Sequence, residues 1–97
     1  MMILVTYDIS VSGTSGAKRL RRVAKECLDY GVRVQNSVFE CDVEPAQWVK
    51  LKSNLLKIYD EEQDSLRFYM LGSNWRIKVE HYGAKQAVDV FRDILII

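Results

Sequence analysis

The chain opens with the stretch Met1-Met2-Ile3-Leu4-Val5-Thr6-Tyr7-Asp8-Ile9. It is rich in Ile, Leu and Val and has polar residues only near its end, which is typical of a central β-strand buried on both faces. Residues 10–16 are mostly Ser and Gly and predict a loop, so Asp8 stands at a strand end. A carboxylate there either binds a divalent metal or accepts hydrogen bonds from loop N–H groups, and the strand alone leaves both interpretations open.

After this loop, an amphipathic helix is predicted from about residue 17 to residue 30, with Ser15 as candidate N-cap and Gly31 as its stop. One face is apolar and carries Leu20, Val23, Ala24, Cys27 and Leu28. Five cations with no acid among them fall within eight residues: Lys18, Arg19, Arg21, Arg22 and Lys25. Because guanidinium groups bind phosphates bidentately, this basic face is a candidate nucleic-acid-binding surface. A merely solvated helix face is the alternative interpretation.

The remainder of the chain predicts further strands around one more helix. Residues 32–43 are predicted to be extended, with Arg33 and Phe39 on the same face. Glu44-Pro45 opens a second helix, the acidic residues 60–64 end it, and strands follow at 66–71 and 75–82 around a turn. If the segment 32–43 contains a bend, this order gives a ferredoxin-like α+β sandwich, an antiparallel sheet with two helices on one face. We expect this fold, in one domain over residues 1–97.

Composition and spacing exclude several classes of protein. The hydrophobic content of 48% fits a globular domain, and the net charge of +1 does not by itself indicate a nucleic-acid binder. Cys27 and Cys41 lack metal-ligand spacing and are expected to be buried free thiols in a reducing compartment. The apolar N-terminal run is too short to span a membrane and has no signal-peptide pattern, so we expect a cytoplasmic protein. There is no Ser/His/Asp set or phosphate-binding glycine loop, and His81 is expected to be structural.

Several segments together resemble the CRISPR-associated protein 2 family. They are Val5-Thr6-Tyr7-Asp8-Ile9, Leu20-Arg21-Arg22-Val23-Ala24-Lys25, Tyr30-Gly31-Val32-Arg33-Val34-Gln35-Asn36-Ser37-Val38-Phe39-Glu40-Cys41 and Tyr69-Met70-Leu71-Gly72. The resemblance covers nearly the whole chain. It implies a homodimer whose C-terminal strand crosses to the partner's sheet, which would cover the apolar tail at residues 94–97. It also implies that the two Asp8 side chains of the dimer share one Mg²⁺.

The same resemblance implies a function in CRISPR spacer acquisition, with Mg²⁺-dependent endonuclease activity. The site residues it implies are Asp8, Tyr7, Arg33 and Phe39, with one arginine of the Arg21-Arg22 pair. We expect double-stranded DNA as substrate rather than single-stranded RNA. Two alternatives stay open. One is a non-catalytic dimeric scaffold that binds DNA and bridges copies of the partner integrase, and the other is a toxin-like endoribonuclease.

Overall fold

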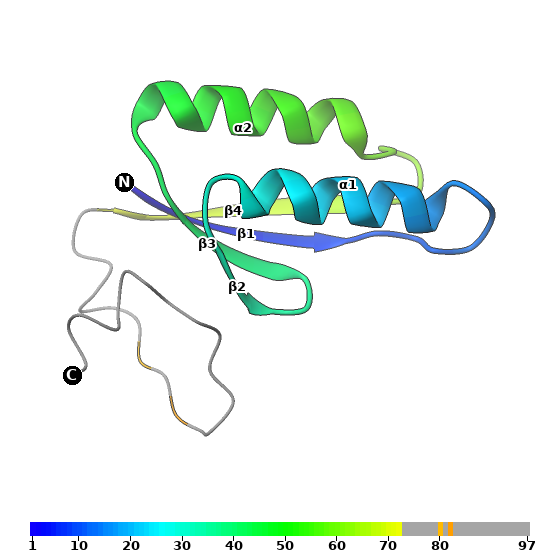
Figure 1. Ribbon diagram of the computed structural model, residues 1–97, viewed down its shortest axis with the longest axis horizontal. Helices are drawn as coiled ribbons and strands as arrows, with labels where there is room; N and C mark the ends of the chain where they lie inside the picture. Colours follow the sequence, from blue (N-terminus) through cyan, green and yellow to red (C-terminus); the bar gives the residue numbers. More distant parts are fainter. Residues whose placement is uncertain (73–79, 81, 83–97) are drawn as a thin grey trace.

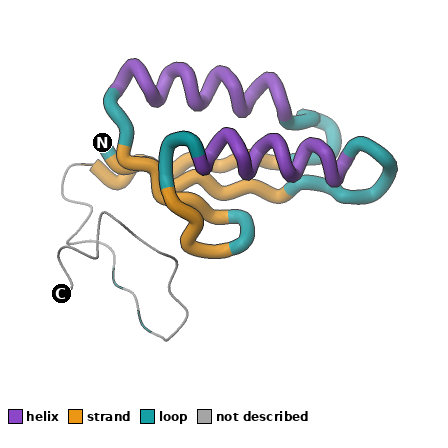
Figure 2. Tube along the Cα trace, viewed as in Figure 1, coloured by secondary structure: helices purple, strands orange, loops and turns teal. Residues whose placement is uncertain are grey.

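The computed structural model describes residues 1–72, 80 and 82. In this part the elements follow the order β1 (Met2–Asp8), α1 (Gly16–Leu28), β2 (Val32–Gln35), β3 (Val38–Asp42), α2 (Pro45–Ile58) and β4 (Ser65–Gly72). The strands form one sheet in the order β2-β3-β1-β4, and every neighbouring pair is antiparallel. Both helices cover the same face of this sheet (Figures 1 and 2). The predicted ferredoxin-like α+β sandwich is therefore confirmed.

The segment 32–43 forms a β-hairpin and not one continuous strand. Asn36 and Ser37 make its turn, and Gln35 pairs with Val38 across it. Arg33 and Phe39 do lie on the same face, as expected, but as directly paired residues on adjacent strands and not through alternation along one strand. Asn and Ser favour turns through local hydrogen bonds, and that was the signal for a bend at this point.

The ends of the helices correct two details of the prediction. Ser15 makes no side-chain capping bond to α1, and the helix ends at Leu28. Gly31 donates its N–H to the Cys27 carbonyl at 2.9 Å, but its φ is not positive, so it is not a left-handed stop. It is needed because a Cβ at this position would overlap the carbonyl oxygen of Glu40. By contrast, α2 begins at Pro45 as predicted.

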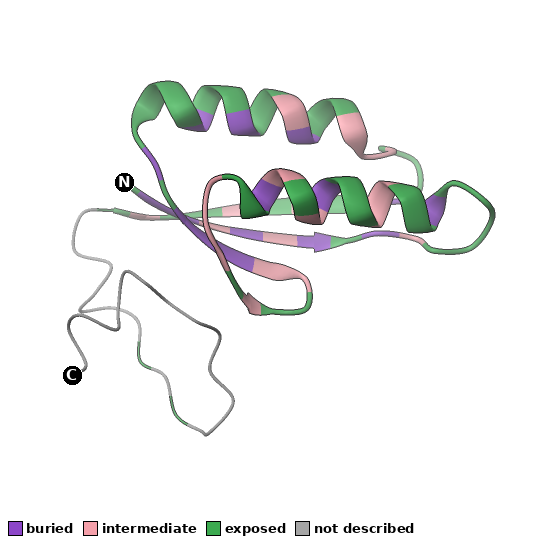
Figure 3. Ribbon diagram, in the orientation of Figure 1, coloured by how far each residue is buried: buried purple, intermediate pink, exposed green. Residues whose placement is uncertain are grey.

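The hydrophobic core lies between the sheet and the two helices (Figure 3). Side chains of β1 alternate between the two faces of the sheet. Ile3, Val5 and Tyr7 are buried among the core residues, whereas Asp8 is exposed at the strand end. From the helices, the core receives Val23, Cys27, Trp48, Leu51 and Leu55. The alternation along β1 thus separates the side chains of Tyr7 and Asp8.

Within the described residues, no helix is long and apolar enough to cross a membrane. The predicted strand at 75–82, with His81, and the apolar tail at 94–97 fall outside the described part, apart from residues 80 and 82. The crossing of a C-terminal strand to a dimer partner therefore stays a prediction.

Candidate functional site

Asp8 lies exposed at the end of β1, opposite Ser65 of β4 in the strand register. Its carboxylate is accessible from solvent. Among residues 1–72, 80 and 82, no cluster of three or more His, Cys, Asp or Glu side chains could hold a metal. Asp8 supplies one carboxylate at this strand end, and Mg²⁺ is commonly held by one or two carboxylates while it keeps several waters. A two-fold axis beside Asp8 would bring a second carboxylate and complete such a site.

Tyr7, Arg33 and Phe39 form a second cluster, on the side of the sheet that the helices cover. The rings of Tyr7 and Phe39 are stacked, with centroids 6.2 Å apart and an interplanar angle of 21°. The Arg33 guanidinium carbon lies 5.1 Å from the centroid of the Phe39 ring, a cation–π contact. The Tyr7 hydroxyl donates to the Asn36 carbonyl at 3.3 Å. Burial raises the pKa of Tyr7, although the nearby Arg33 acts to lower it, so the hydroxyl stays protonated at neutral pH.

The four residues implied as catalytic do not converge within one chain. Tyr7, Arg33 and Phe39 lie together, but strand alternation directs Asp8 to the opposite face. Phe39 is 0% exposed and Tyr7 is 6% exposed. The ring of Phe39 contacts Tyr7 and Arg33 in this structure, and a catalytic role for Phe39 stays a prediction. Arg33 is exposed, and its role at a site stays a prediction.

The basic face of α1 also differs from the prediction. Four of its five cations are exposed and fall within an arc of about 100° at the usual helical rotation, and we call them the basic arc: Lys18, Arg21, Arg22 and Lys25. Arg19 is not part of it. Its side chain is only 11% exposed and pairs with Asp64. Nucleic-acid binding by the basic arc stays a prediction. Arg19 instead forms an ion pair within the protein.

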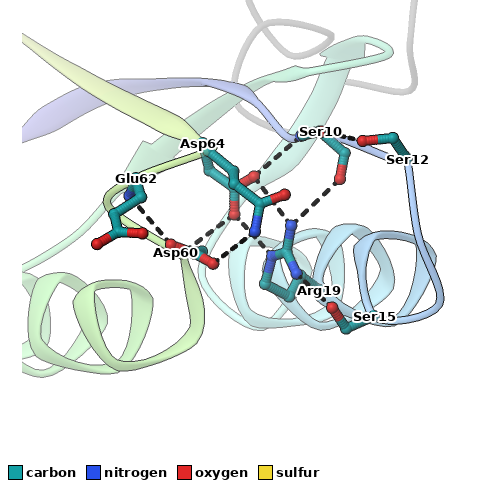
Figure 4. A network of polar contacts seen from close by, with 8 residues as sticks. Ser10, Ser12, Ser15, Arg19, Asp60, Glu62 and Asp64 are labelled. Carbon is teal, nitrogen blue, oxygen red and sulfur yellow. Dashed lines mark hydrogen bonds and ion pairs between the residues drawn. The ribbon is translucent and has the colours of Figure 1, made fainter.

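Arg19 and Asp64 lie at the centre of a polar network between two loops (Figure 4). The network joins the loop after β1 to the loop before β4. Sequence reasoning missed this pair and treated Asp64 only as part of an acidic stretch at the end of α2. The available signal was one arginine at the border between the apolar and basic faces of α1, together with an acid directly before a strand.

The fold defines a small ferredoxin-like α+β protein that exposes a carboxylate, Asp8, at the end of β1. A family model described as CRISPR associated protein Cas2 matches residues 1–79, and the chain belongs to that family. This confirms the resemblance seen in the sequence.

Individual relatives match over nearly their full length. A protein of Nitratidesulfovibrio vulgaris named CRISPR-associated endoribonuclease Cas2 is 62% identical, over 92% of this chain and 87% of its own. A protein of Halalkalibacterium halodurans named CRISPR-associated endonuclease Cas2 is 56% identical, over 93% and 94%. The crystal structure of Streptococcus pyogenes Cas2 at pH 6.5 superimposes with a TM-score of 0.76 at 59% identity, covering 86% of this chain and 100% of that one.

Proposed function

We propose that two copies of this chain form a Mg²⁺-dependent endonuclease that acts in CRISPR spacer acquisition. The observation that carries this proposal is the exposed Asp8 carboxylate at the end of β1, where a second copy can face it. The relatives named endoribonuclease and endonuclease support cleavage of phosphodiester bonds by this chain.

In this proposal, each Asp8 supplies one carboxylate to a shared ion. Bound Mg²⁺ would polarise a phosphoryl oxygen and activate a water at neutral pH. The protein's part is to hold the two carboxylates and to orient the substrate. The exposed Arg33 guanidinium and the basic arc are the groups that would contact phosphates.

We propose double-stranded DNA as the preferred substrate. The basic arc carries four cations and no aromatic side chain, which suits a charged backbone better than unpaired bases that stack on rings. The names of several relatives favour RNA instead. The test therefore uses both polymers.

The test compares the wild-type protein with Asp8→Asn, using linear duplex DNA and single-stranded RNA of the same sequence with Mg²⁺. We expect Asp8→Asn to lose at least about 100-fold in cleavage, because even residues that only support a metal ligand cost about 10–100-fold. Asp29→Asn is the matched control, since Asp29 is an exposed acid at the C-terminal end of α1. Undiminished cleavage by Asp8→Asn would show that Asp8 is not catalytic. If the protein cleaved RNA and not DNA, then RNA would be its substrate.

A second candidate is a non-catalytic dimeric scaffold that binds duplex DNA and bridges copies of the partner integrase. It is favoured by the contrast between four exposed cations on α1 and a single carboxylate at the strand end. The two candidates differ in a cell-based assay of spacer acquisition. The scaffold predicts that Asp8→Asn acquires spacers normally, whereas a required nuclease predicts that acquisition is lost.

A further inference from the structure

We propose that the Arg19–Asp64 ion pair positions the Asp8 end of β1, and that Arg19 acts as a positioning residue and not as a ligand of nucleic acid. This inference rests on the proposed function, because it assigns a role at the same site. It also separates Arg19 from Arg21 and Arg22, which lie only two and three residues further along the same helix.

The ion pair is closely bonded and hidden from solvent. The Arg19 Nε donates to Asp64 Oδ2 at 2.8 Å, and its Nη2 donates to Asp64 Oδ1 at 3.3 Å. The Asp64 side chain is 0% exposed. A guanidinium held in this bidentate way has a fixed orientation. Its remaining donors are therefore directed at fixed points of the loop after β1.

Ser10 is held by the ion pair at both of its backbone polar groups. Its N–H donates to Asp64 Oδ1 at 2.9 Å, and its carbonyl accepts from Arg19 Nη2 at 3.2 Å. Ser10 comes two residues after Asp8 in the chain. Arg19 Nη1 also donates to the Ser15 hydroxyl at 2.8 Å, so both ends of the loop are tied to the same guanidinium (Figure 4).

The ion pair also fixes the strand that runs beside Asp8. Asp64 directly precedes Ser65, the partner of Asp8 in the β1–β4 register. The Oδ2 atom of Asp64 accepts a hydrogen bond from the Asp60 N–H at 2.9 Å, which fixes the turn that leads into β4. The pair therefore anchors both the loop that follows Asp8 and the start of β4, the strand that pairs with Asp8.

A site shared between two subunits needs such an anchor. Catalytic groups must stay within about 0.5 Å of their productive positions, and here the two carboxylates would come from separate chains. The loop after Asp8 contains Gly13, which has no Cβ to restrict the backbone and has a φ of +88°. Without the ion pair, the end of β1 would keep its pairing with β4, but the loop that follows it would lose the contacts that hold Ser10.

The test compares Arg19→Ala, the milder Arg19→Lys, and Arg21→Ala from the basic arc, all assayed on duplex DNA with Mg²⁺. We expect Arg19→Ala to lower kcat by at least about 10-fold, the usual minimum for residues that support a metal ligand, while KM changes less than about twofold. Arg19→Lys keeps the positive charge but has one donor nitrogen in place of three, and it should restore part of kcat. Arg21→Ala should instead raise KM. A raised KM with unchanged kcat in Arg19→Ala would show that Arg19 contacts nucleic acid and would overturn the inference.

Two readouts are independent of cleavage. Amide hydrogen exchange should accelerate at Ser10 and its loop neighbours in Arg19→Ala and Asp64→Asn but not in Arg21→Ala. Binding of Mn²⁺ alone, followed by electron paramagnetic resonance, should weaken in the same two variants. If wild-type and Asp8→Asn proteins cleave equally, the proposed function fails, and exchange at Ser10 still decides whether the pair anchors the strand end. Unchanged exchange in both variants would overturn the inference.

Discussion

Tyr7 and Asp8 are neighbours in the chain, but their side chains lie on opposite faces of the sheet. Tyr7 is packed against Phe39 beneath the helices, whereas Asp8 is exposed at the strand end. The alternation of a β-strand imposes this separation. The two residues implied together as catalytic therefore have separate environments, and their substitutions should have separate effects.

Replacing Tyr7 by Phe removes the hydroxyl bond to the Asn36 carbonyl and keeps the ring stacked on Phe39. We expect the free energy of unfolding to fall by about 0.5–1.5 kcal/mol, the usual net value of one hydrogen bond. Cleavage should stay within about twofold of wild type, because a hydroxyl whose pKa is raised by burial is not a base at neutral pH. Urea unfolding and a cleavage assay check both expectations. A folded Tyr7→Phe protein that is as inactive as Asp8→Asn would give Tyr7 a direct role.

The order of elements could be predicted from the sequence because each element carries a local signal. The apolar run of β1, the helical spacing of Val23 and Cys27, and Pro45 at the start of α2 all depend on near neighbours in the chain. The hairpin at Asn36-Ser37 was hidden because polar turn residues also fit the alternation of a half-exposed strand.

The arrangement of the site was harder to predict because it depends on contacts that are distant in sequence. Arg19 and Asp64 are separated by 45 positions, and the position of Arg19 at the border of the basic face does not by itself identify Asp64 as its partner. Likewise, the pairing of Arg33 with Phe39 follows from the hairpin register and not from spacing along one strand.

Replacing both Arg21 and Arg22 by Ala should weaken binding of duplex DNA and flatten its salt dependence. Each phosphate contact that is lost should reduce the slope of log K against log salt by about 0.9, so the double variant should lose up to about 1.8. Lys50→Ala with Lys57→Ala on α2 is the matched control, because it removes the same charge from another exposed helix. Fluorescence anisotropy at several salt concentrations measures the slopes. Equal slopes in the two double variants would contradict binding through the basic arc.

Replacing Gly31 by Ala should be strongly destabilising, since the new Cβ would overlap the carbonyl oxygen of Glu40 and crowd Cys41. Overpacking against fixed groups costs about 1–3 kcal/mol, and we expect the upper part of this range. Gly13→Ala is the comparison, because a Cβ there meets nothing within 4 Å and only the φ of +88° opposes it. Urea unfolding gives both values. A Gly31→Ala protein as stable as wild type would show that the end of α1 can move away from β3.

Cys27 and Cys41 should not react with thiol reagents in the native protein. Burial raises the pKa of each thiol to about 12, and both side chains are 0% exposed. Near pH 8 only about one thiol in 10,000 would be the reactive thiolate, even with open access. We expect no reaction with a disulfide reagent in buffer and two reacting thiols in denaturant. Fast modification of the native protein would contradict this burial.

Asp64 should make the protein sensitive to acid. Burial acts to raise the pKa of this carboxyl, but hydrogen bonds from Arg19 and from the N–H groups of Asp60 and Ser10 together lower it below its ordinary value of 3.8. The unfolded chain therefore takes up this proton at higher pH than the folded protein does. The contribution of ionised Asp64 to the free energy of unfolding is complete above the ordinary pKa of the carboxyl. It is lost as the pH falls through the lower pKa that Asp64 has in the folded protein.

We therefore expect Asp64→Asn to be less stable than wild type at neutral pH, with a difference that shrinks below about pH 4. Urea unfolding at a series of pH values measures this, and Asp29→Asn, an exposed acid at the end of α1, controls for the general charge effect. Because Asp64 accepts the hydrogen bond from the Ser10 N–H, the protection of this amide against exchange, relative to its intrinsic rate at each pH, should fall over the same acid range. A stability difference that stays constant down to pH values below the ordinary pKa would show that the ionised Asp64 does not stabilise the fold through Arg19.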